Sequence, residues 1–410
     1  MLAKEEEDAT DENKEIQNDK KVTIAYVISI TSCQANATHV LDGAAILAHS
    51  IHLVSQNSTY GYARYAFVYE HEAAECVSAL ERVGWKTIVE NKLPLEKDQI
   101  VDADFRKHVD KHGCCGIKEF MKLKVYTLED HPIAVHLDTD ALLLKPMDRL
   151  YNTMLLAPGT NTNKTLADDH LMFHKRPTNA SDFFFTRDYR QGSKWTDDPS
   201  QYGVQGGFLA VKPNRTMYEE LISRLTNETY GLYRGWSGMG HSGFWGASQI
   251  QGFLSYVYEH HYPGQAIELN RCIYNAMIND SPYHKKTGAC LTKEKECQDC
   301  RTLDIENLMS IHLTTCRKPW ECPHLPDKQF PKLCRDAHRA WFQVRQDLEK
   351  NTWKLSVPTD GWRFEWTLGY CQRPAGMARM LGIANLTMGP NKPKNSRQYV
   401  PLLLPYTSYR

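Results

Sequence analysis

The feature that most limits how this chain can fold is a mainly apolar run that stops at two carboxylates. The run from Ile133 to Leu137 is followed at once by Asp138, Thr139 and Asp140. A run of this length and composition is typical of a buried strand. A strand that ends in this way places both acidic side chains at the carboxyl edge of its sheet, and ligands of open α/β sheets bind at that edge.

Asp138 and Asp140 also limit the chemistry. Two carboxylates from one short turn can hold a divalent ion, but they leave most of its coordination sphere open. Substrate phosphates usually fill such open positions on Mg²⁺ or Mn²⁺. The pair therefore indicates a metal-diphosphate site and points to nucleotide-sugar chemistry. Similar turns also occur as caps and solvated loops, so the motif needs support from elsewhere in the chain.

That support comes from a second segment, which begins at His312. This histidine follows the short apolar stretch from Ile305 to Ile311, and Lys318 lies six residues beyond it. An imidazole suits Mn²⁺ or another first-row ion as a third ligand. A lysine is a compact cation suited to a diphosphate. Pro319 and Trp320 are expected to stiffen this loop. Without the first motif, His312 would be interpreted as a structural histidine.

Together the two segments resemble the glycogenin-like retaining glycosyltransferases of family 8. That family has Asp-x-Asp at mid-chain and His-x-x-Gly-x-x-Lys-Pro-Trp near the end of its catalytic domain. This chain keeps the second motif except for Thr315 in place of glycine. The resemblance implies that Asp138, Asp140 and His312 bind Mn²⁺, with Mg²⁺ as the alternative. It also implies that Lys318 contacts the diphosphate of a UDP-sugar donor.

Other segments resemble the donor-binding parts of the family. The segment from 117 to 128 has apolar residues at helical spacing, and its Lys122 falls where a family lysine approaches the donor. The alternative for Lys122 is a solvated helix lysine. Thr31 and Ser32 follow the first expected strand, at the edge where the family binds uracil. The resemblance implies donor contacts for all three residues.

The sugar and the reacting carbon are expected to meet residues from three further places. Gln205 and Gly206 open an apolar strand that resembles the family's Asn-Ser-Gly strand, which contacts the donor sugar. Small residues at this position let the backbone approach a ligand closely. The alternative explanation for the glycine is a β-bulge. Gln251 resembles the glutamine of the family's Asp-Gln pair, which recognises the sugar, but Ile250 replaces the aspartate. Asp188 could compensate, or it is a solvated loop carboxylate. The missing aspartate favours attack from the same face as the departing diphosphate over a covalent intermediate.

The alternation of elements predicts an α/β fold. Strands are expected at 21–30, 65–69 and 87–89, with helices at 43–54 and 73–83 between them. This order implies a mostly parallel sheet covered by helices on both faces. The resemblance, which covers roughly residues 21 to 325, implies the GT-A type of nucleotide-binding fold.

The expected domain organisation has three parts. Residues 1–20 are acidic and lack apolar periodicity, which predicts a disordered leader or stem. Residues 21–333 are assigned to the GT-A catalytic domain. Residues 334–410 are assigned to a C-terminal extension that contains cysteines and tryptophans and packs on the catalytic domain.

Composition excludes some partners. Basic and acidic residues number 49 each, so the chain has no nucleic-acid footprint. No stretch of about 18 apolar residues occurs, and the start of the chain does not resemble a signal peptide. We therefore expect membrane attachment only through an anchor absent from this chain.

Other features point to the secretory pathway. Asn-x-Ser/Thr sequons exceed the number expected by chance, and they include those at Asn36, Asn57, Asn163, Asn179, Asn214, Asn227 and Asn385. The 12 cysteines form an even number, which favours disulfides in an oxidising lumen. Cys297 and Cys300 could instead form a zinc or redox pair. The expected location is the Golgi or ER lumen, and the alternative is a cytoplasmic enzyme with reduced cysteines.

Two other classes of function were weighed against the transferase. A phosphatase of the haloacid-dehalogenase type also begins with Asp-x-Asp after an apolar strand, but it has that motif at the start of its domain. A catalytically inactive sugar- or nucleotide-binding relative is the remaining alternative, since Ile250 and Thr315 depart from the family pattern. The sequence does not identify the sugar. The expected acceptor is a glycan, a glycoprotein or a glycolipid.

Overall fold

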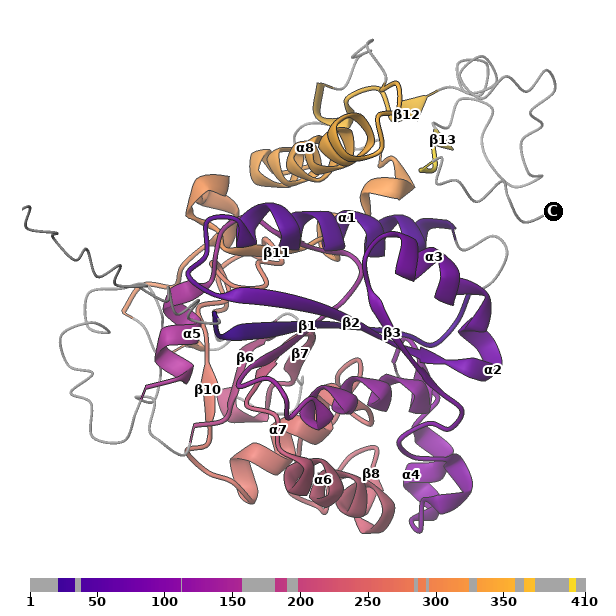
Figure 1. The fold of residues 1–410 in the computed structure, drawn as a ribbon. Helices are drawn as coiled ribbons and strands as arrows, with labels where there is room; N and C mark the ends of the chain where they lie inside the picture. The colour runs from indigo at the N-terminus through magenta and orange to yellow at the C-terminus, as the bar shows by residue number, and fades with distance from the viewer. Residues whose placement is uncertain are drawn as a thin grey trace, which may run out of the picture.

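A mixed sheet of seven strands lies at the centre of the structure, a computed structural model (Figure 1). The structure describes residues 21–33, 38–111, 113–156, 181–189, 198–283, 287–292, 295–323, 330–357, 365–372 and 398–402. From one edge of the sheet to the other the strands are β10 (Ala266–Glu268), β6 (Phe183–Arg187), β7 (Val204–Val211), β4 (Ala134–Leu137), β1 (Thr23–Ile30), β2 (Gly61–Tyr69) and β3 (Lys86–Glu90).

Helices and small sheets surround this central sheet. The α-helices are α1 (Thr38–Ser55), α2 (Glu70–Ala73), α3 (Val77–Arg82), α4 (Ala103–His108), α5 (Asp148–Met154), α6 (Arg215–Asn227), α7 (Ile250–His260) and α8 (Lys332–Asp347). The longest 3-10 helix is η3 (Gly116–Thr127), and a π-helical turn, η9 (Leu348–Thr352), extends α8. Two-stranded sheets pair β5 (Ala141–Leu143) with β11 (Ser310–His312), β8 (Tyr230–Gly231) with β9 (Gly235–Trp236), and β12 (Cys371–Gln372) with β13 (Gln398–Tyr399).

The strand directions confirm the predicted fold class. β1 is parallel to β2 and β4, β2 is parallel to β3, and β10 is parallel to β6. Only β7 runs against its neighbours, β4 and β6, in this sheet. The sheet is therefore mostly parallel. Because β7 is reversed, its first residues lie at the same edge as the carboxyl ends of β4 and β6.

Alternate residues of the strands pack against two different layers of helices. Tyr26 and Ile28 of β1 belong to the core that α1, α3 and α5 cover. Ala25 and Val27 belong to the core that η3, α4, α6 and α7 cover. Figure 1 shows α1 on one face of the sheet and α6 and α7 on the other. This period of two is the ordinary consequence of strand geometry.

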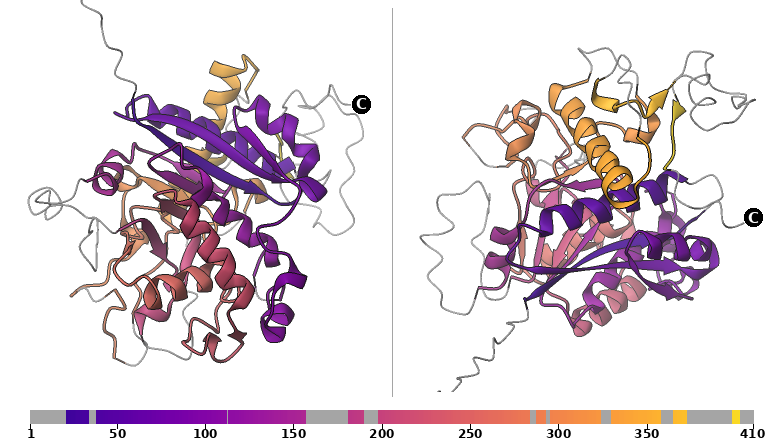
Figure 2. Two further views of the ribbon diagram at one scale, coloured as in Figure 1. Left: turned by 60° about the horizontal axis from the view of Figure 1, so that its bottom comes forward. Right: turned by 45° about the horizontal axis from the view of Figure 1, so that its top comes forward.

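Helix α1 is buried on two sides. Its Ala44 and Leu47 face the sheet, whereas its Ala45 and Ile46 pack into a third core with Trp341 of α8. A helix that is apolar all round is typical of a buried position. Figure 2 shows α8 lying across α1, and the backbone amide of Leu402 donates to Asp42 Oδ2 of α1 at 2.9 Å. The predicted domain boundary at residue 334 falls inside α8, and the division into domains stays a prediction.

Most elements expected from the sequence are present with shifted bounds. The three predicted strands correspond to β1, β2 and β3, and the first predicted helix corresponds to α1. The helix expected over 73–83 is divided among α2, the 3-10 turn η1 (Ala74–Cys76) and α3. The helix expected near Lys122 is of the 3-10 type over its whole length. The hydrophobic pattern therefore predicted a helix there but not its type.

Five disulfides use ten of the 12 cysteines. They join Cys33 to Cys76, Cys272 to Cys300, Cys290 to Cys297, Cys316 to Cys334, and Cys322 to Cys371. Cys297 and Cys300 thus lie in separate disulfides, and the zinc or redox interpretation of that pair is wrong. The disulfides are compatible with an oxidising lumen.

Three of the sequons named above lie on the surface of the protein. Asn57, Asn214 and Asn227 are exposed, as glycosylation acceptors must be, whereas Asn36, Asn163, Asn179, Asn385 and the acidic leader lie outside the described residues. Among the helices that the structure describes, none is long and apolar enough to cross a membrane.

His338 of α8 makes the stability of the third core depend on pH. Its Nε2–H donates to the carbonyls of Cys316 and Arg317, both at 3.1 Å, and its Nδ1 is buried without a partner. Burial lowers the pKa of His338 to about 4. The unfolded chain takes up this proton near pH 6.5, so folding loses stability as the pH falls from there towards 4.

We expect the free energy of unfolding to fall less on acidification in His338→Gln, which keeps a donor but does not titrate. Of the free energy of unfolding that the wild type loses between pH 7 and pH 4, His338 accounts for at most roughly 3 kcal/mol. Urea unfolding at both pH values, with the disulfides intact, measures this difference. An equal loss of stability in the two proteins would contradict the assignment.

Candidate active site

The site forms where several strands end at one edge of the central sheet. β4 ends at Leu137, and the next residue, Asp138, has its backbone amide 3.2 Å from the carbonyl oxygen of Gly207 on β7. The Asp138 carbonyl then accepts from the amide of Ala141 at 2.9 Å, which closes a tight turn before β5. The turn holds Asp138 and Asp140 at fixed positions on the carboxyl edge.

His312 reaches the two aspartates through the small sheet of β5 and β11. In its antiparallel register Ala141 pairs with His312, so the histidine lies beside the residue that follows Asp140. The amide of Leu313 also donates to the carbonyl of Asp140 at 3.0 Å. Two segments far apart in the sequence are thus joined by backbone hydrogen bonds at the site itself.

Asp138, Asp140 and His312 form a compact cluster of three metal-binding side chains. One ligand atom from each lies within 4.8 Å of the other two. His312 Nε2 is 3.2 Å from Asp140 Oδ1 and 3.9 Å from Asp138 Oδ2. Asp140 and His312 are buried, whereas Asp138 is partly exposed. The structure therefore brings together all three residues that the sequence predicted as metal ligands.

Two lysines lie against these carboxylates. Lys318 forms an ion pair with Asp140 Oδ2. Lys122 Nζ is 2.8 Å from Asp138 Oδ1 and 2.7 Å from Glu119 Oε1, and it donates to the carbonyl of Gly206 at 3.0 Å. Both lysines that the sequence predicted as donor contacts thus reach the site. Lys122 is buried, so it is not the solvated helix lysine that the sequence left as an alternative.

The charges of the cluster change one another's protonation. Burial acts to raise the pKa of Asp138, but Lys122 and His312 lower it to about 2. Burial acts to lower the pKa of Lys122, and the carboxylates of Asp138 and Glu119 raise it above its ordinary value. Burial lowers the pKa of His312, although Asp138 opposes this effect. At neutral pH the site thus contains the ionised carboxylate of Asp138, charged Lys122 and the neutral imidazole of His312, which is able to bind a cation.

Gly207 makes room for His312 on the neighbouring strand. A Cβ atom at Gly207 would lie 2.4 Å from His312 Cε1 and 2.7 Å from His312 Nδ1, well inside contact distance. Gly207 therefore allows the close approach of a side chain, the ring of His312. The pairing of β6 with β7 also shifts register between Phe185 and Arg187, so an irregularity of the kind predicted for a bulge is present.

Gln205 belongs to a buried network of amides. Its Oε1 accepts from the amide of Gly207 at 2.6 Å and from Asn275 Nδ2 at 3.0 Å. Asn275 Nδ2 also donates to Thr186 Oγ1 at 3.0 Å, while Asn275 Oδ1 is buried without a partner. The sequence analysis missed Asn275. Its backbone has φ of 51°, a left-handed conformation that asparagine tolerates better than most residues, but one asparagine is too weak a signal to single out.

Gln251 lies in the first turn of α7 and faces the start of β7. Its Oε1 accepts from the amide of Gly206 at 3.3 Å, and its Nε2 donates to the carbonyl of Trp245 at 2.7 Å. Ile250, at the position of the family aspartate, is fully buried, and its Cγ2 would lie 3.0 Å from a Cβ at Gly206. An apolar contact thus replaces a carboxylate at this point.

Asp188 follows β6 at the same edge of the sheet. It is 3% exposed, so it is not the solvated loop carboxylate that the sequence left open. Its amide is 3.3 Å from the carbonyl oxygen of Gly203, and its negative charge acts to raise the pKa of His312. Asp188 therefore lies close enough to the cluster to act on it electrostatically.

Thr31 and Ser32 lie where β1 ends, beside β4 in the parallel pair. Thr31 is partly buried and Ser32 is exposed. Ser29 lies two residues before Thr31, and its Oγ is 3.0 Å from His136 Nε2. Burial lowers the pKa of His136 to about 3. The two residues share the carboxyl edge with Asp138, and their contact with a nucleotide base stays a prediction.

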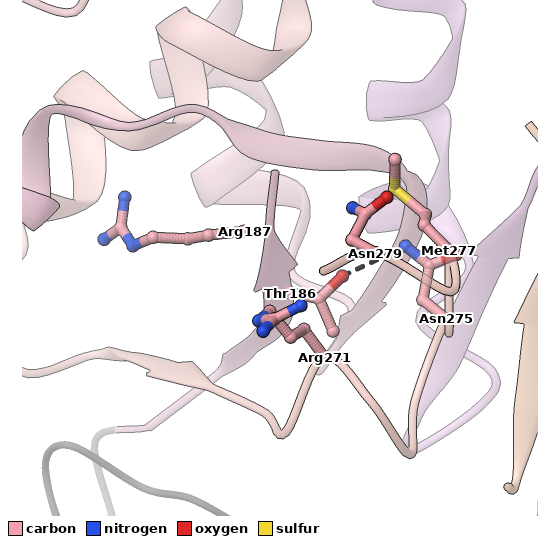
Figure 3. A pocket seen from close by; sticks show the side chains of 6 residues that line it. All are labelled: Thr186, Arg187, Arg271, Asn275, Met277 and Asn279. Atoms are coloured by element: carbon pink, nitrogen blue, oxygen red, sulfur yellow. Dashed lines mark hydrogen bonds between the residues drawn. The ribbon is translucent and has the colours of Figure 1, made fainter. Parts of the chain in front are cut away.

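A small pocket adjoins the amide network. It is lined by Thr186, Arg187, Arg271, Asn275, Met277 and Asn279. Figure 3 shows the side chains of Asn275, Asn279 and Met277 gathered at one end of the pocket, with the hydrogen bond between Asn275 and Thr186. The Arg187 side chain points away from them and forms ion pairs with Glu259 and Glu268.

No family model matches the chain, and no curated protein matches it. Solved structures similar to it are glycosyltransferases. Mouse xyloside xylosyltransferase 1 in its apo form has 12% identity and a TM-score of 0.42, over 71% of this chain and 97% of its own. The galactosyltransferase LgtC with donor and acceptor sugar analogs has 12% identity and a TM-score of 0.45, over 83% and 99%. The glycosyltransferase GlyE of Streptococcus pneumoniae has 13% identity and a TM-score of 0.39, over 78% and 60%.

At these identities and TM-scores the function of this protein has to be inferred from the side chains of its own site.

We expect Gly207→Ala to lower the free energy of unfolding by about 1–3 kcal/mol, because the added methyl group overpacks the site against His312. Gly231→Ala is the matched control, since its Cβ would meet Arg234 Cβ at an ordinary 3.7 Å. Urea unfolding of both variants and the wild type measures the difference. Equal stabilities of the two variants would show that His312 has room to move.

Proposed function

We propose that this protein is a retaining glycosyltransferase that moves a sugar from a UDP-sugar to an acceptor hydroxyl, with Mn²⁺ bound by Asp138, Asp140 and His312. The observation that carries the proposal is the convergence of these three side chains within 4.8 Å, with Lys122 and Lys318 paired to the carboxylates. Such an arrangement suits a divalent ion together with a diphosphate.

The donor set fits a first-row metal. Two carboxylates and one imidazole supply hard oxygen and borderline nitrogen ligands, which suit Mn²⁺ better than Mg²⁺, although Mg²⁺ remains an alternative. Lys122 and Lys318 offset the negative charge of Asp138 and Asp140, which a bound metal ion would otherwise offset. Three protein ligands leave positions for phosphate oxygens. When bound, the ion supplies Lewis-acid stabilisation of the charge on the leaving diphosphate.

The lysines are assigned to the diphosphate. Lys318 and Lys122 each neutralise one aspartate, and both would be free to turn to phosphate oxygens once a cation takes over that task. Charge grows on the diphosphate as the bond to the anomeric carbon breaks. Fixed ammonium groups within a partly buried site stabilise this charge more strongly than water does.

The start of β7 and the first turn of α7 are assigned to the sugar. Gln205, Gly206 and Gln251 form one hydrogen-bonded group there, and Asn275 extends it. The unpartnered Oδ1 of Asn275 is available to accept from a sugar hydroxyl. Thr31 and Ser32 are assigned to the uracil base, at the end of β1.

The stereochemical course follows from the side chain at position 250. Because Ile250 is apolar and buried, it offers no nucleophile to the anomeric carbon. We therefore propose same-face attack, in which a diphosphate oxygen assists the acceptor hydroxyl and Gln251 and Asp188 orient the reacting groups. A sugar adduct trapped on the protein would contradict this course.

An exposed aromatic ring supports a glycan acceptor. Trp245 is 53% exposed, and its carbonyl accepts from Gln251. A flat, exposed indole next to the candidate catalytic residue suits the apolar face of a sugar ring. Tyr233 is also exposed, whereas Tyr230, Trp236 and Phe244 of the same segment are buried. We propose that Trp245 contributes to acceptor binding on a glycan, a glycoprotein or a glycolipid.

The location and the domain division complete the proposal. The disulfides and the exposed sequons support the lumen of the Golgi or the ER. Residues 21–333 are proposed as the catalytic domain and 334–410 as an extension. Cys316–Cys334 and Cys322–Cys371 would tie the two parts together.

A second candidate function is that of an inactive sugar- or nucleotide-binding relative. It is favoured by Ile250 and by Thr315, whose hydroxyl donates to Asn279 Oδ1 at 3.0 Å in the loop that follows His312. The three intact metal-binding side chains speak for the active enzyme.

We expect one member of a panel of UDP-sugars to release UDP when incubated with the protein and Mn²⁺. The release should disappear with EDTA and in Asp140→Asn, which removes one carboxylate charge from the cluster. Binding of UDP and Mn²⁺ without release from any donor would favour the inactive relative. Absence of binding would contradict the metal site.

Lys318→Met is expected to lower turnover by about 10²–10³-fold, because the leaving diphosphate loses one fixed cation. The Mn²⁺ concentration for half-maximal activity should not rise in this variant, because Lys318 competes with Mn²⁺ for the Asp140 carboxylate in the wild type. Lys350→Met, at an exposed position of η9, is the matched control and should keep full activity. Equal turnover in the two variants would remove Lys318 from the reaction.

A further inference from the structure

Two cysteines remain outside the disulfides. Cys114 and Cys115 are free and exposed, and they lie just before η3. The other ten cysteines of the chain are paired. A free dithiol in a chain whose other cysteines all form disulfides calls for a separate explanation.

These thiols form a cluster with a buried carboxylate. Cys114 Sγ lies 2.6 Å from Cys115 Sγ and 3.2 Å from Glu119 Oε2. The three ligand atoms lie within 4.8 Å of one another. Glu119 is 7% exposed, so its carboxylate faces the thiols from inside the protein.

The chain geometry opposes a disulfide between the two thiols. Neighbouring Cα atoms are about 3.8 Å apart, whereas disulfides ordinarily join Cα atoms about 4.4–6.8 Å apart. A bond between Cys114 and Cys115 would therefore be strained and easily reduced. Two adjacent thiols that resist oxidation are instead suited to share one soft cation.

We propose that Cys114, Cys115 and Glu119 form a second cation site, selective for a thiophilic divalent ion such as Zn²⁺. Two thiolates carry two negative charges, which a divalent cation balances. The Glu119 carboxylate shares Lys122 with Asp138, so it keeps negative charge to offer such a cation. Zn²⁺ binds such mixed sulfur and oxygen ligands at about 2.0–2.3 Å, and the exposed thiols can separate to the spacing that tetrahedral ligands need.

This site is connected to the Asp138 cluster through one side chain. Glu119 Oε1 is 2.7 Å from Lys122 Nζ, which is 2.8 Å from Asp138 Oδ1. A cation that engages Glu119 weakens its hold on Lys122. Lys122 then pairs more strongly with Asp138 and competes with a cation there. The dithiol site would thus reduce the Mn²⁺ affinity of the catalytic cluster, a consequence that rests on the proposed function.

Zn²⁺ binding can be tested without turnover in the full chain with its disulfides intact. In Asp140→Asn, which weakens the other cluster, we expect one Zn²⁺ by calorimetry and protection of two thiols from a disulfide reagent. Adding Cys114→Ser and Cys115→Ser should remove this Zn²⁺ without changing the thermal unfolding midpoint by more than a few degrees. Glu119→Gln should weaken binding and keep both thiols reactive without Zn²⁺.

Two results would overturn the site. Thiols that react equally with and without Zn²⁺ would show that the ion binds elsewhere. Absence of reactive thiols before reduction would show that Cys114 and Cys115 are joined by a disulfide after all.

The connection is tested by the free Mn²⁺ signal in electron paramagnetic resonance. Zn²⁺ should raise the apparent Kd for Mn²⁺ about fivefold in the wild type, at the low end of typical coupling between sites. It should have no such effect in the Cys114→Ser/Cys115→Ser variant. An equal shift in both proteins would mean direct competition at Asp138. This binding assay stays informative even if no UDP-sugar is turned over.

Discussion

The site depends on the backbone pairing of β5 with β11. This short ladder places His312 next to the turn that holds Asp138 and Asp140, although the two segments lie far apart in the sequence. Backbone hydrogen bonds fix positions more sharply than flexible side chains can, because they leave few free dihedral angles. Without this pairing, the carboxylates would remain at the sheet edge and the cluster would lack its nitrogen ligand.

Charge balance is the second requirement of this arrangement. Two carboxylates held close together and partly out of water repel each other unless cations lie beside them. Lys122 and Lys318 meet this need, and Glu119 in turn balances Lys122. The same side chains that neutralise the two carboxylates are the ones that the proposed function assigns to the diphosphate of the donor. Under that proposal, the stability of the cluster and the binding of the donor have one electrostatic origin.

Trp320 shows how the C-terminal part of the chain supports the loop of Lys318. Its ring stacks on His39 of α1, with centroids 5.9 Å apart, and meets the edge of Trp341 of α8 at the same distance. Pro319 begins a short 3-10 turn beside it. The stiffening predicted from Pro319 and Trp320 thus depends on packing between helices as well as on the local chain.

The sequence by itself determined the strands β1 to β4, the mostly parallel character of the sheet and the identity of the cluster residues. It could do so because apolar runs and the ligand preferences of carboxylate, imidazole and ammonium groups are local properties. Only the tertiary structure decided which residues support them. Gly207 gains its importance from the ring of His312, and Asn275 gains its importance from its hydrogen bond to Gln205. Each is a contact between distant segments, and no local pattern records such contacts.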